Sequence, residues 1–136
     1  MSKSNQSEND TLKLFLQGVD PAWRAGATIY LALYTADPGE AGTATTNEAA
    51  YGSYARVTVT AATGFSAASG GASDNTGLIQ FPECTSGSET ITHVAIVTTT
   101  SGAGQIIYSG ALTASRAISS GIQPQFAIGA LDITED

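Results

Sequence analysis

The segment 28–34 (TIYLALY) constrains the fold more than any other part of the sequence, because both of its faces are largely apolar. Side chains alternate between the two faces of a β-strand, so one face would carry Ile29, Leu31 and Leu33. The opposite face would carry two tyrosines and an alanine. Such a strand needs cover on both sides, as in a sandwich whose outer face meets another element or another protein. We therefore expect a buried strand here, and a homo-oligomer (dimer or trimer) that supplies part of its cover.

Composition also favours a β fold. The 136 residues suit one domain. Charged residues make up 12% of the chain. That is about half of the share in an average protein, which is roughly 25%. Threonine, serine, alanine and glycine take the place of the charged residues that solvent-exposed helices use. Further strands are expected at 55–61, 78–81, 90–99, 105–112, around Ile118, and at 125–134. This spacing predicts an all-β, two-sheet β-sandwich of the jelly-roll type.

The N-terminal region is expected to differ from the rest of the domain. Residues 1–10 are polar and predict a flexible, disordered arm ahead of a single sandwich domain at 11–136. A short helix is expected at 11–17, with Asp10 as its N-cap and Gly18 just beyond its end.

The predicted helix carries an apolar stripe, since Leu12, Phe15 and Leu16 fall at helical spacing. A helix of about two turns is too short to persist alone, so the stripe should dock on the domain or on a neighbouring subunit.

The segment 35–51 (TADPGEAGTATTNEAAY) shows no strand periodicity and contains a proline and two glycines. Loops of more than about 12–15 residues without internal structure are uncommon in compact domains and are usually functional or flexible. We expect this loop to be an arm between subunits, with an ordinary solvated loop as the equal alternative.

Charge and cysteine content exclude several classes of function. The formal net charge is −7 and the five basic residues are scattered, so the chain has no basic face for nucleic acid or for anionic membranes. One cysteine and one histidine cannot form a disulfide within the chain or a Cys/His zinc site. The sequence shows no signal peptide and no apolar run long enough to span a bilayer, so we expect a soluble protein made in a cytoplasm.

Catalytic motifs are not evident either. His93 lies in the expected strand 90–99, where a hydrogen-bonded packing role is the more common one, and Cys84 follows Pro82 in a loop. A Cys84/His93 hydrolase is the enzymatic alternative, but no nucleophile motif surrounds Cys84. Asp37, Glu40 and Glu48 do not follow the spacing of a calcium loop. We expect no enzyme activity, no metal and no cofactor.

Several segments carry a resemblance to a known family. These are 30–42 (YLALYTADPGEAG), 46–49 (TNEA), 54–57 (YARV), 81–82 (FP), 91–93 (ITH) and 108–110 (YSG). In their order the chain resembles a family of small tailed-phage and prophage virion proteins, often labelled tail-fibre proteins, over about residues 12–136.

The resemblance implies a structural role in the virion and no catalytic residues. Because the chain lacks heptads and repeats, we interpret it as similar to capsid decoration (cement) proteins. Such a protein would be assembled in the host cytoplasm and would sit on the capsid surface. There it would bridge major capsid protein subunits and stabilise the DNA-filled head. The alternative is a tail-fibre or baseplate component with receptor or carbohydrate binding.

Aromatic and arginine side chains often dominate the energy of interfaces. The residues of this type that flank the two segments expected to be mobile are our candidate subunit contacts: Trp23, Arg24, Tyr51, Tyr54 and Arg56. Packing inside the sandwich is the alternative role for Trp23 and Tyr54.

Overall fold

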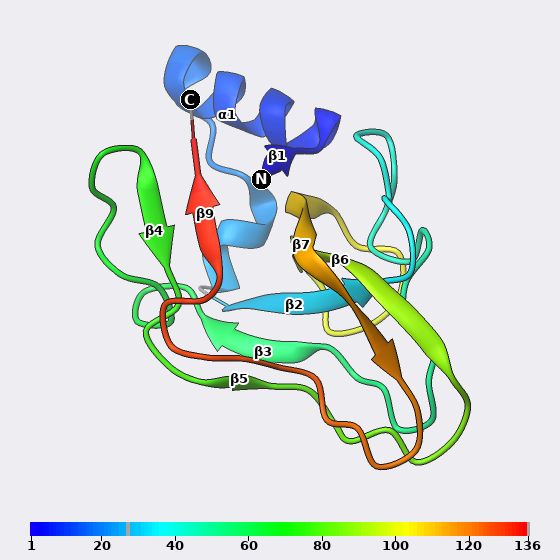
Figure 1. Ribbon diagram of the computed structural model, residues 1–136. Helices are drawn as coiled ribbons and strands as arrows, with labels where there is room; N and C mark the ends of the chain where they lie inside the picture. Colours follow the sequence, from blue (N-terminus) through cyan, green and yellow to red (C-terminus); the bar gives the residue numbers. More distant parts are fainter. Residues whose placement is uncertain (27, 136) are drawn as a thin grey trace.

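A five-stranded antiparallel sheet forms the centre of the computed structural model, which describes residues 1–26 and 28–135 (Figure 1). Its strand order is β1-β7-β6-β2-β3. The strands of this sheet are β1 (Ser2–Lys3), β2 (Thr28–Tyr34), β3 (Val57–Thr60), β6 (Glu89–Val97) and β7 (Ile106–Ile118).

Two short ribbons pack against this sheet, and one helix and a 3-10 turn lie before β2. One ribbon pairs β4 (Ala72–Asp74) with β9 (Asp132–Thr134), and the other pairs β5 (Ile79–Gln80) with β8 (Gln125–Phe126). The helix is α1 (Asn5–Gln17), and the 3-10 turn is η1 (Ala22–Gly26).

Both faces of β2 are buried, as its apolar pattern predicts. On one face Ile29, Leu31 and Leu33 join the main hydrophobic core, which the two ribbons complete. On the other face Tyr34 packs in a second cluster that includes Ala44 from the following loop. Since the chain covers both faces itself, this strand no longer argues for a second subunit, and the dimer or trimer stays a prediction.

The loop that follows β2 is ordered and folds back over the sheet. The backbone N–H of Ala49 donates to the carbonyl oxygen of Leu33 (2.8 Å), and the Tyr34 hydroxyl donates to the carbonyl oxygen of Ala44 (2.9 Å). Burial raises the pKa of Tyr34, which keeps the hydroxyl protonated as a donor. Within one chain the segment 35–51 therefore serves as the cover of β2, and not as a projecting arm.

The N-terminal residues, where a flexible arm was expected at 1–10, form a strand and the start of a helix. Strand β1 pairs with β7, and α1 begins at Asn5, so the helix is longer than the one expected at 11–17. Its N-cap is Ser4 and not Asp10, because the Ser4 hydroxyl accepts the Ser7 N–H (3.2 Å) and donates to the Ile106 carbonyl oxygen. Such a side-chain oxygen satisfies a backbone donor that the first turn of a helix leaves open. The helix ends as predicted, with Gly18 in the left-handed conformation (φ 64°).

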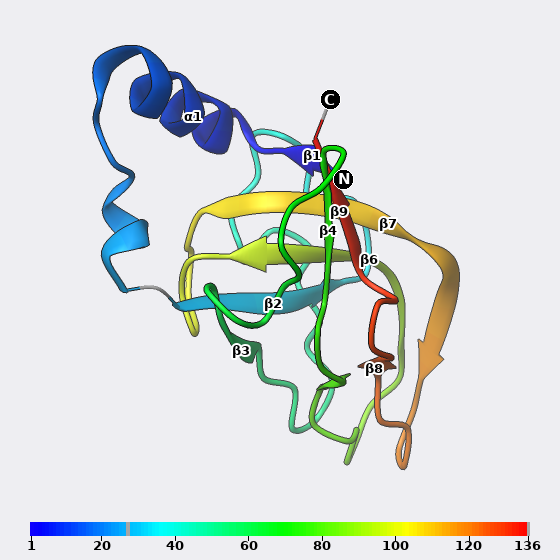
Figure 2. The same cartoon turned by 90° about the vertical axis from the view of Figure 1, so that its left-hand side faces the viewer.

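The mostly β character is confirmed, whereas the jelly roll stays a prediction because the described strands form an open sheet and two ribbons. Strand β2 has the predicted bounds, and β3 and β6 lie within the segments expected for them, apart from the first residue of β6. The expected strands at 105–112 and around Ile118 are one long strand, β7, which bends sharply in Figure 2. Strand β4 lies in a glycine- and serine-rich segment that is not among the strands expected from the sequence.

Candidate functional site

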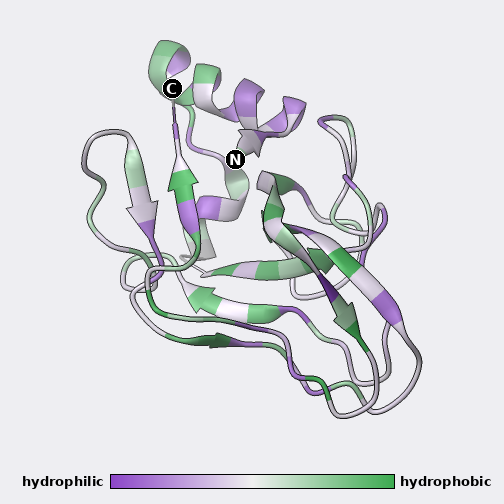
Figure 3. Cartoon of the chain, viewed as in Figure 1, coloured by the Kyte–Doolittle hydropathy of each residue, from purple (hydrophilic) through white to green (hydrophobic). Residues whose placement is uncertain are grey.

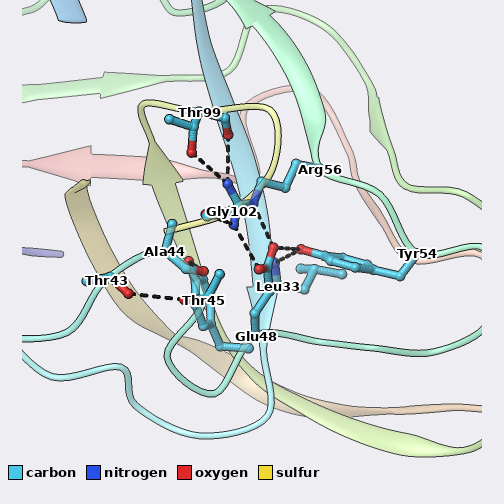
Figure 4. A network of polar contacts seen from close by, with 10 residues as sticks. Leu33, Thr43, Ala44, Thr45, Glu48, Tyr54, Arg56, Thr99 and Gly102 are labelled. Atoms are coloured by element: carbon cyan, nitrogen blue, oxygen red, sulfur yellow. Dashed lines mark hydrogen bonds and ion pairs between the residues drawn. The ribbon is translucent and has the colours of Figure 1, made fainter. Parts of the chain in front are cut away.

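An ion pair between Arg56 and Glu48 lies at the centre of a dense polar cluster (Figure 4). The pair is bidentate, with Nε to Oε1 at 2.7 Å and Nη2 to Oε2 at 2.8 Å. The Tyr54 hydroxyl donates to Glu48 Oε1 (3.0 Å) and accepts the Leu33 backbone N–H (3.0 Å). The cluster thus joins the loop after β2 to β2 itself and to the segment that leads into β3.

Arg56 extends this cluster to the connection between β6 and β7. Its Nη1 donates to the carbonyl oxygen (2.8 Å) and hydroxyl (2.9 Å) of Thr99, and its Nη2 donates to the Gly102 carbonyl oxygen (2.8 Å). All five N–H groups of the guanidinium are therefore used. The side chain is only 2% exposed, and the hydrogen bonds to Glu48 raise the pKa of Arg56. We call Glu48, Tyr54, Arg56, Thr99 and Gly102 the arginine clamp.

Tyr51 lies next to the clamp and is also buried. Its ring meets the Tyr54 ring edge to face, with centroids 5.3 Å apart, and its hydroxyl donates to the Pro82 carbonyl oxygen (2.8 Å). Burial raises the pKa of Tyr51 to about 12. The neighbouring carboxylate of Glu89 accepts the backbone N–H groups of Ala50 and Tyr51, both at 2.9 Å. Tyr51, Tyr54 and Arg56 are thus engaged within the chain, and contact with a partner stays a prediction for them.

The other two predicted contacts lie on η1. Trp23 is half-buried, packs against the main core and donates from Nε1 to Asp10 Oδ2 of α1 (3.2 Å). Arg24 is exposed and pairs with Asp20 (2.6 Å). An exposed ion pair of this kind contributes little to stability in water. The structure therefore splits the five candidates into three inward-facing residues and two on the 3-10 turn.

The residues of the enzymatic alternative have local partners. Cys84 is buried, and its thiol lies 3.2 Å from the Ser86 carbonyl oxygen. The Nδ1 atom of His93 is hydrogen-bonded to the Thr92 hydroxyl (2.8 Å). Within residues 1–26 and 28–135, no three potential metal ligands come together.

Asn75 is a structural residue that sequence reasoning missed. It is almost fully buried, and its side chain donates to the carbonyl oxygens of Gly77 (2.8 Å) and Ala127 (2.9 Å). Its Oδ1 accepts the Leu131 N–H (2.9 Å). Asn75 thereby joins the segment after β4 to the one before β9. An asparagine close to a glycine is typical of an ordinary turn, so the local sequence did not indicate that Asn75 is buried.

Helix α1 presents its apolar side to solvent. Ser7 is buried, and Asp10, Thr11 and Leu14 are half-buried, so a mainly polar side of the helix faces the domain. The opposite side follows the i, i+3, i+4, i+7 pattern of an apolar face. We call this surface the α1 stripe: Leu12 (56% exposed), Phe15 (77%) and Leu16 (77%) on the helix, and Val19 (51%) just beyond its C-cap Gly18. Figure 3 shows the contrast between the hydrophilic start of the helix and its apolar second half.

An exposed apolar face of this kind marks an interaction surface more often than an isolated exposed leucine does. Sequence reasoning identified three of the four stripe residues but expected the stripe to be covered. Neither described helix is long and apolar enough to cross a membrane.

A family model described as podophage GP4 fiber I protein gp80 matches residues 2–134. No curated protein matches the sequence.

Proposed function

Because the chain belongs to the family described as podophage GP4 fiber I protein gp80, we propose that it is a structural subunit of a surface fibre on a tailed-phage virion. The observation that carries this proposal is the α1 stripe. Three large apolar side chains of the helix, and Val19 just beyond its end, face water, while the polar side of the helix is turned inward. That arrangement suits a subunit that is completed by assembly.

The arginine clamp supports a mechanical role rather than a chemical one. A fibre subunit has to keep its shape while it carries load between the virion and the host surface. The clamp joins three chain segments through the buried guanidinium of Arg56, and the fully used donor groups leave it no free N–H for a ligand. We propose that the protein has no catalytic activity, and the local partners of Cys84 and His93 support this.

A second candidate function is capsid decoration. It is favoured by the dimensions of the fold, a short domain of one central sheet and two ribbons without the heptads or repeats of a long shaft. In this case the chain would lie between subunits of the major capsid protein and would stabilise the filled head. Trp23 and Arg24 on η1 would then be the contacts with the shell.

The two functions differ in location and copy number, and both can be measured on purified virions. Gold-labelled antibodies against the full chain should mark the fibres, and quantitative mass spectrometry should find few copies relative to the major capsid protein. Label over the whole head, with a copy number comparable to that of the major capsid protein, would establish decoration instead. A chain missing from virions altogether would refute both proposals.

Cosedimentation of the purified chain provides an independent check. The chain should bind isolated tails or fibre-less particles and should not bind undecorated shells. Saturable binding to shells alone would favour decoration. If tails bind the chain, carbohydrate or receptor recognition becomes the next property to measure.

A further inference from the structure

An apolar crevice of about 370 Å³ opens between the central sheet and the β4–β9 ribbon. The side chains that line it include Trp23 of η1, Ile29 of β2, Phe65, Ala68, Ile107 of β7 and Ile133 of β9. Ala68 is exposed at this crevice, and Glu135 also lies along it. The volume is within the range of pockets that hold ligands or anchoring side chains.

The α1 stripe and this crevice are therefore both exposed apolar surfaces, the first convex and the second concave. The α1 stripe projects side chains at the spacing by which amphipathic helices enter apolar grooves. The crevice offers a concave surface of the same polarity.

The helix of the same chain is held in its present position with the stripe turned outward. Strand β1 is paired with β7, the Ser4 hydroxyl donates to the Ile106 carbonyl oxygen, and Asp10 accepts hydrogen bonds from Trp23 and Gln105. To place its own stripe in its own crevice, the chain would have to break these contacts. The stripe of a different molecule has no such constraint.

We propose that the α1 stripe of one copy docks into the crevice of a second copy. One such contact covers both exposed apolar surfaces, whereas an unrelated partner would cover only one of them. Charge is also compatible, because Lys13 is exposed beside the stripe, and the carboxylate of Glu135 at the crevice, although paired with Lys3, is still 44% exposed. The contact joins two different patches, so it generates a ring, a reciprocal pair or an open chain of subunits.

A single contact of this kind is small compared with a stable interface, which buries roughly 1,600 Å² in total. We therefore expect association that depends on concentration in the isolated protein and that becomes tight when each subunit makes the contact twice. The inference rests on the proposed function only in treating the stripe as an assembly surface. A protein found on fibres that never self-associates would disprove the docking and leave the proposed function intact.

The test uses two full-length variants, Phe15→Cys on the stripe and Ala68→Cys at the crevice. Both positions are exposed, so neither change should disturb folding. The two proteins are given different tags, mixed and oxidised. The expected product is a disulfide-linked dimer that carries both tags. Its yield should be several-fold above that of the unmodified chain, whose single Cys84 is buried.

The matched control is Gln17→Cys, an exposed position on the same helix that points away from the stripe. It should give only background cross-linking with Ala68→Cys. Disulfides mainly between two copies of Phe15→Cys would show helix-to-helix packing and would overturn the proposal. Equal yields for Phe15→Cys and Gln17→Cys would also overturn it.

Sedimentation velocity gives a readout that needs no cysteine. The wild-type chain should show association that increases with concentration, and Leu16→Glu should abolish it while the circular dichroism spectrum is unchanged. A compact monomer at every concentration would contradict the docking. Association that survives Leu16→Glu would assign self-contact to another surface and would equally contradict it.

Discussion

The arginine clamp allows a quantitative test of how the fold is held together, through the substitution Arg56→Met. Methionine keeps much of the apolar stem of the side chain and removes the guanidinium. The change deletes five hydrogen bonds, two of them to the carboxylate of Glu48. It also leaves Glu48 without its ionic partner.

The expected cost is a loss of about 3–4 kcal/mol in the free energy of unfolding. Removing one partner of a buried ion pair typically costs about 3–5 kcal/mol, because the remaining charge is left uncompensated. We expect the lower part of that range for Arg56→Met, since the Glu48 side chain is 15% exposed and keeps the hydrogen bond from Tyr54. The carbonyl oxygens of Thr99 and Gly102 lose a donor as well, so the loss should be well above that of a surface pair.

Urea unfolding followed by circular dichroism measures this difference, and Arg24→Met is the matched control. The same substitution there removes an exposed pair, whose side chains are 59% and 69% accessible. Its loss should cost at most about 1 kcal/mol. The double variant Glu48→Leu/Arg56→Met should recover part of the loss, because it leaves no unpaired charge. If Arg56→Met and Arg24→Met have equal effects, the clamp does not stabilise the fold and our reasoning is wrong.

Three further predictions concern other parts of the chain. Asn75→Ala should lower the free energy of unfolding by about 2–3 kcal/mol, because it leaves buried backbone groups without hydrogen-bond partners. The control Gln80→Ala, at an exposed position, should change it by less than about 0.5 kcal/mol, and thermal unfolding compares the two. Burial raises the pKa of Tyr54 above its usual 10.0, so folding favours the neutral phenol. The free energy of unfolding should therefore be constant below about pH 10 and should fall as the pH rises above it. Urea unfolding at a series of alkaline pH values should show a smaller fall for Tyr54→Phe than for the wild type. The pKa of Glu135 is lowered, mainly by the hydrogen bond from Lys3. Its contribution is present at neutral pH and is lost as the pH falls through that lowered pKa. The wild type and Lys3→Met should therefore have the same free energy of unfolding at acid pH, as measured by urea unfolding. A difference that persists in acid would contradict this prediction.

Local sequence patterns predicted the central strand well, because its signal is contained in one short run of consecutive residues. The alternation in β2 identified both of its faces and both of its ends. What covers the second face was not predictable, since Tyr34 meets Ala44 through a loop that has no periodicity. The turn that brings them together depends on backbone hydrogen bonds and not on an apolar pattern.

The N-terminal region shows how composition can mislead. Residues 1–9 contain few apolar side chains, which favoured a disordered arm, yet Ser4 caps a helix and donates to the strand beside it. A serine suits disordered and capping positions alike, so only the position of Ile106 in space distinguishes the two. Strand β4 escaped notice for a related reason, because its partner β9 lies at the far end of the sequence (Ser73↔Ile133) and its own sequence carries no β pattern.

The candidate site was predicted in part. Arginine and tyrosine were chosen because their chemistry suits interfaces, and the same chemistry suits a buried clamp when a carboxylate lies within reach. Nothing in the sequence spacing of Glu48 and Arg56 indicates that they meet. The α1 stripe was visible in the sequence, but whether it faces the domain or the solvent depends on where the helix is held.

The strand order of the central sheet also determines how long β2 lacks one of its partners while the chain is being synthesised. Strand β2 pairs with β6, and Leu31 lies opposite Ile96, so almost half of the chain is made between these two partners. At translation rates of about 5–20 residues per second, the ribosome needs roughly 3–13 s to make the chain between them. For that time the edge of β2 that pairs with β6 has no partner. This wait is long compared with the microseconds in which a β-hairpin forms. We therefore expect the newly made chain to be most prone to aggregation in the seconds after residues 28–34 emerge.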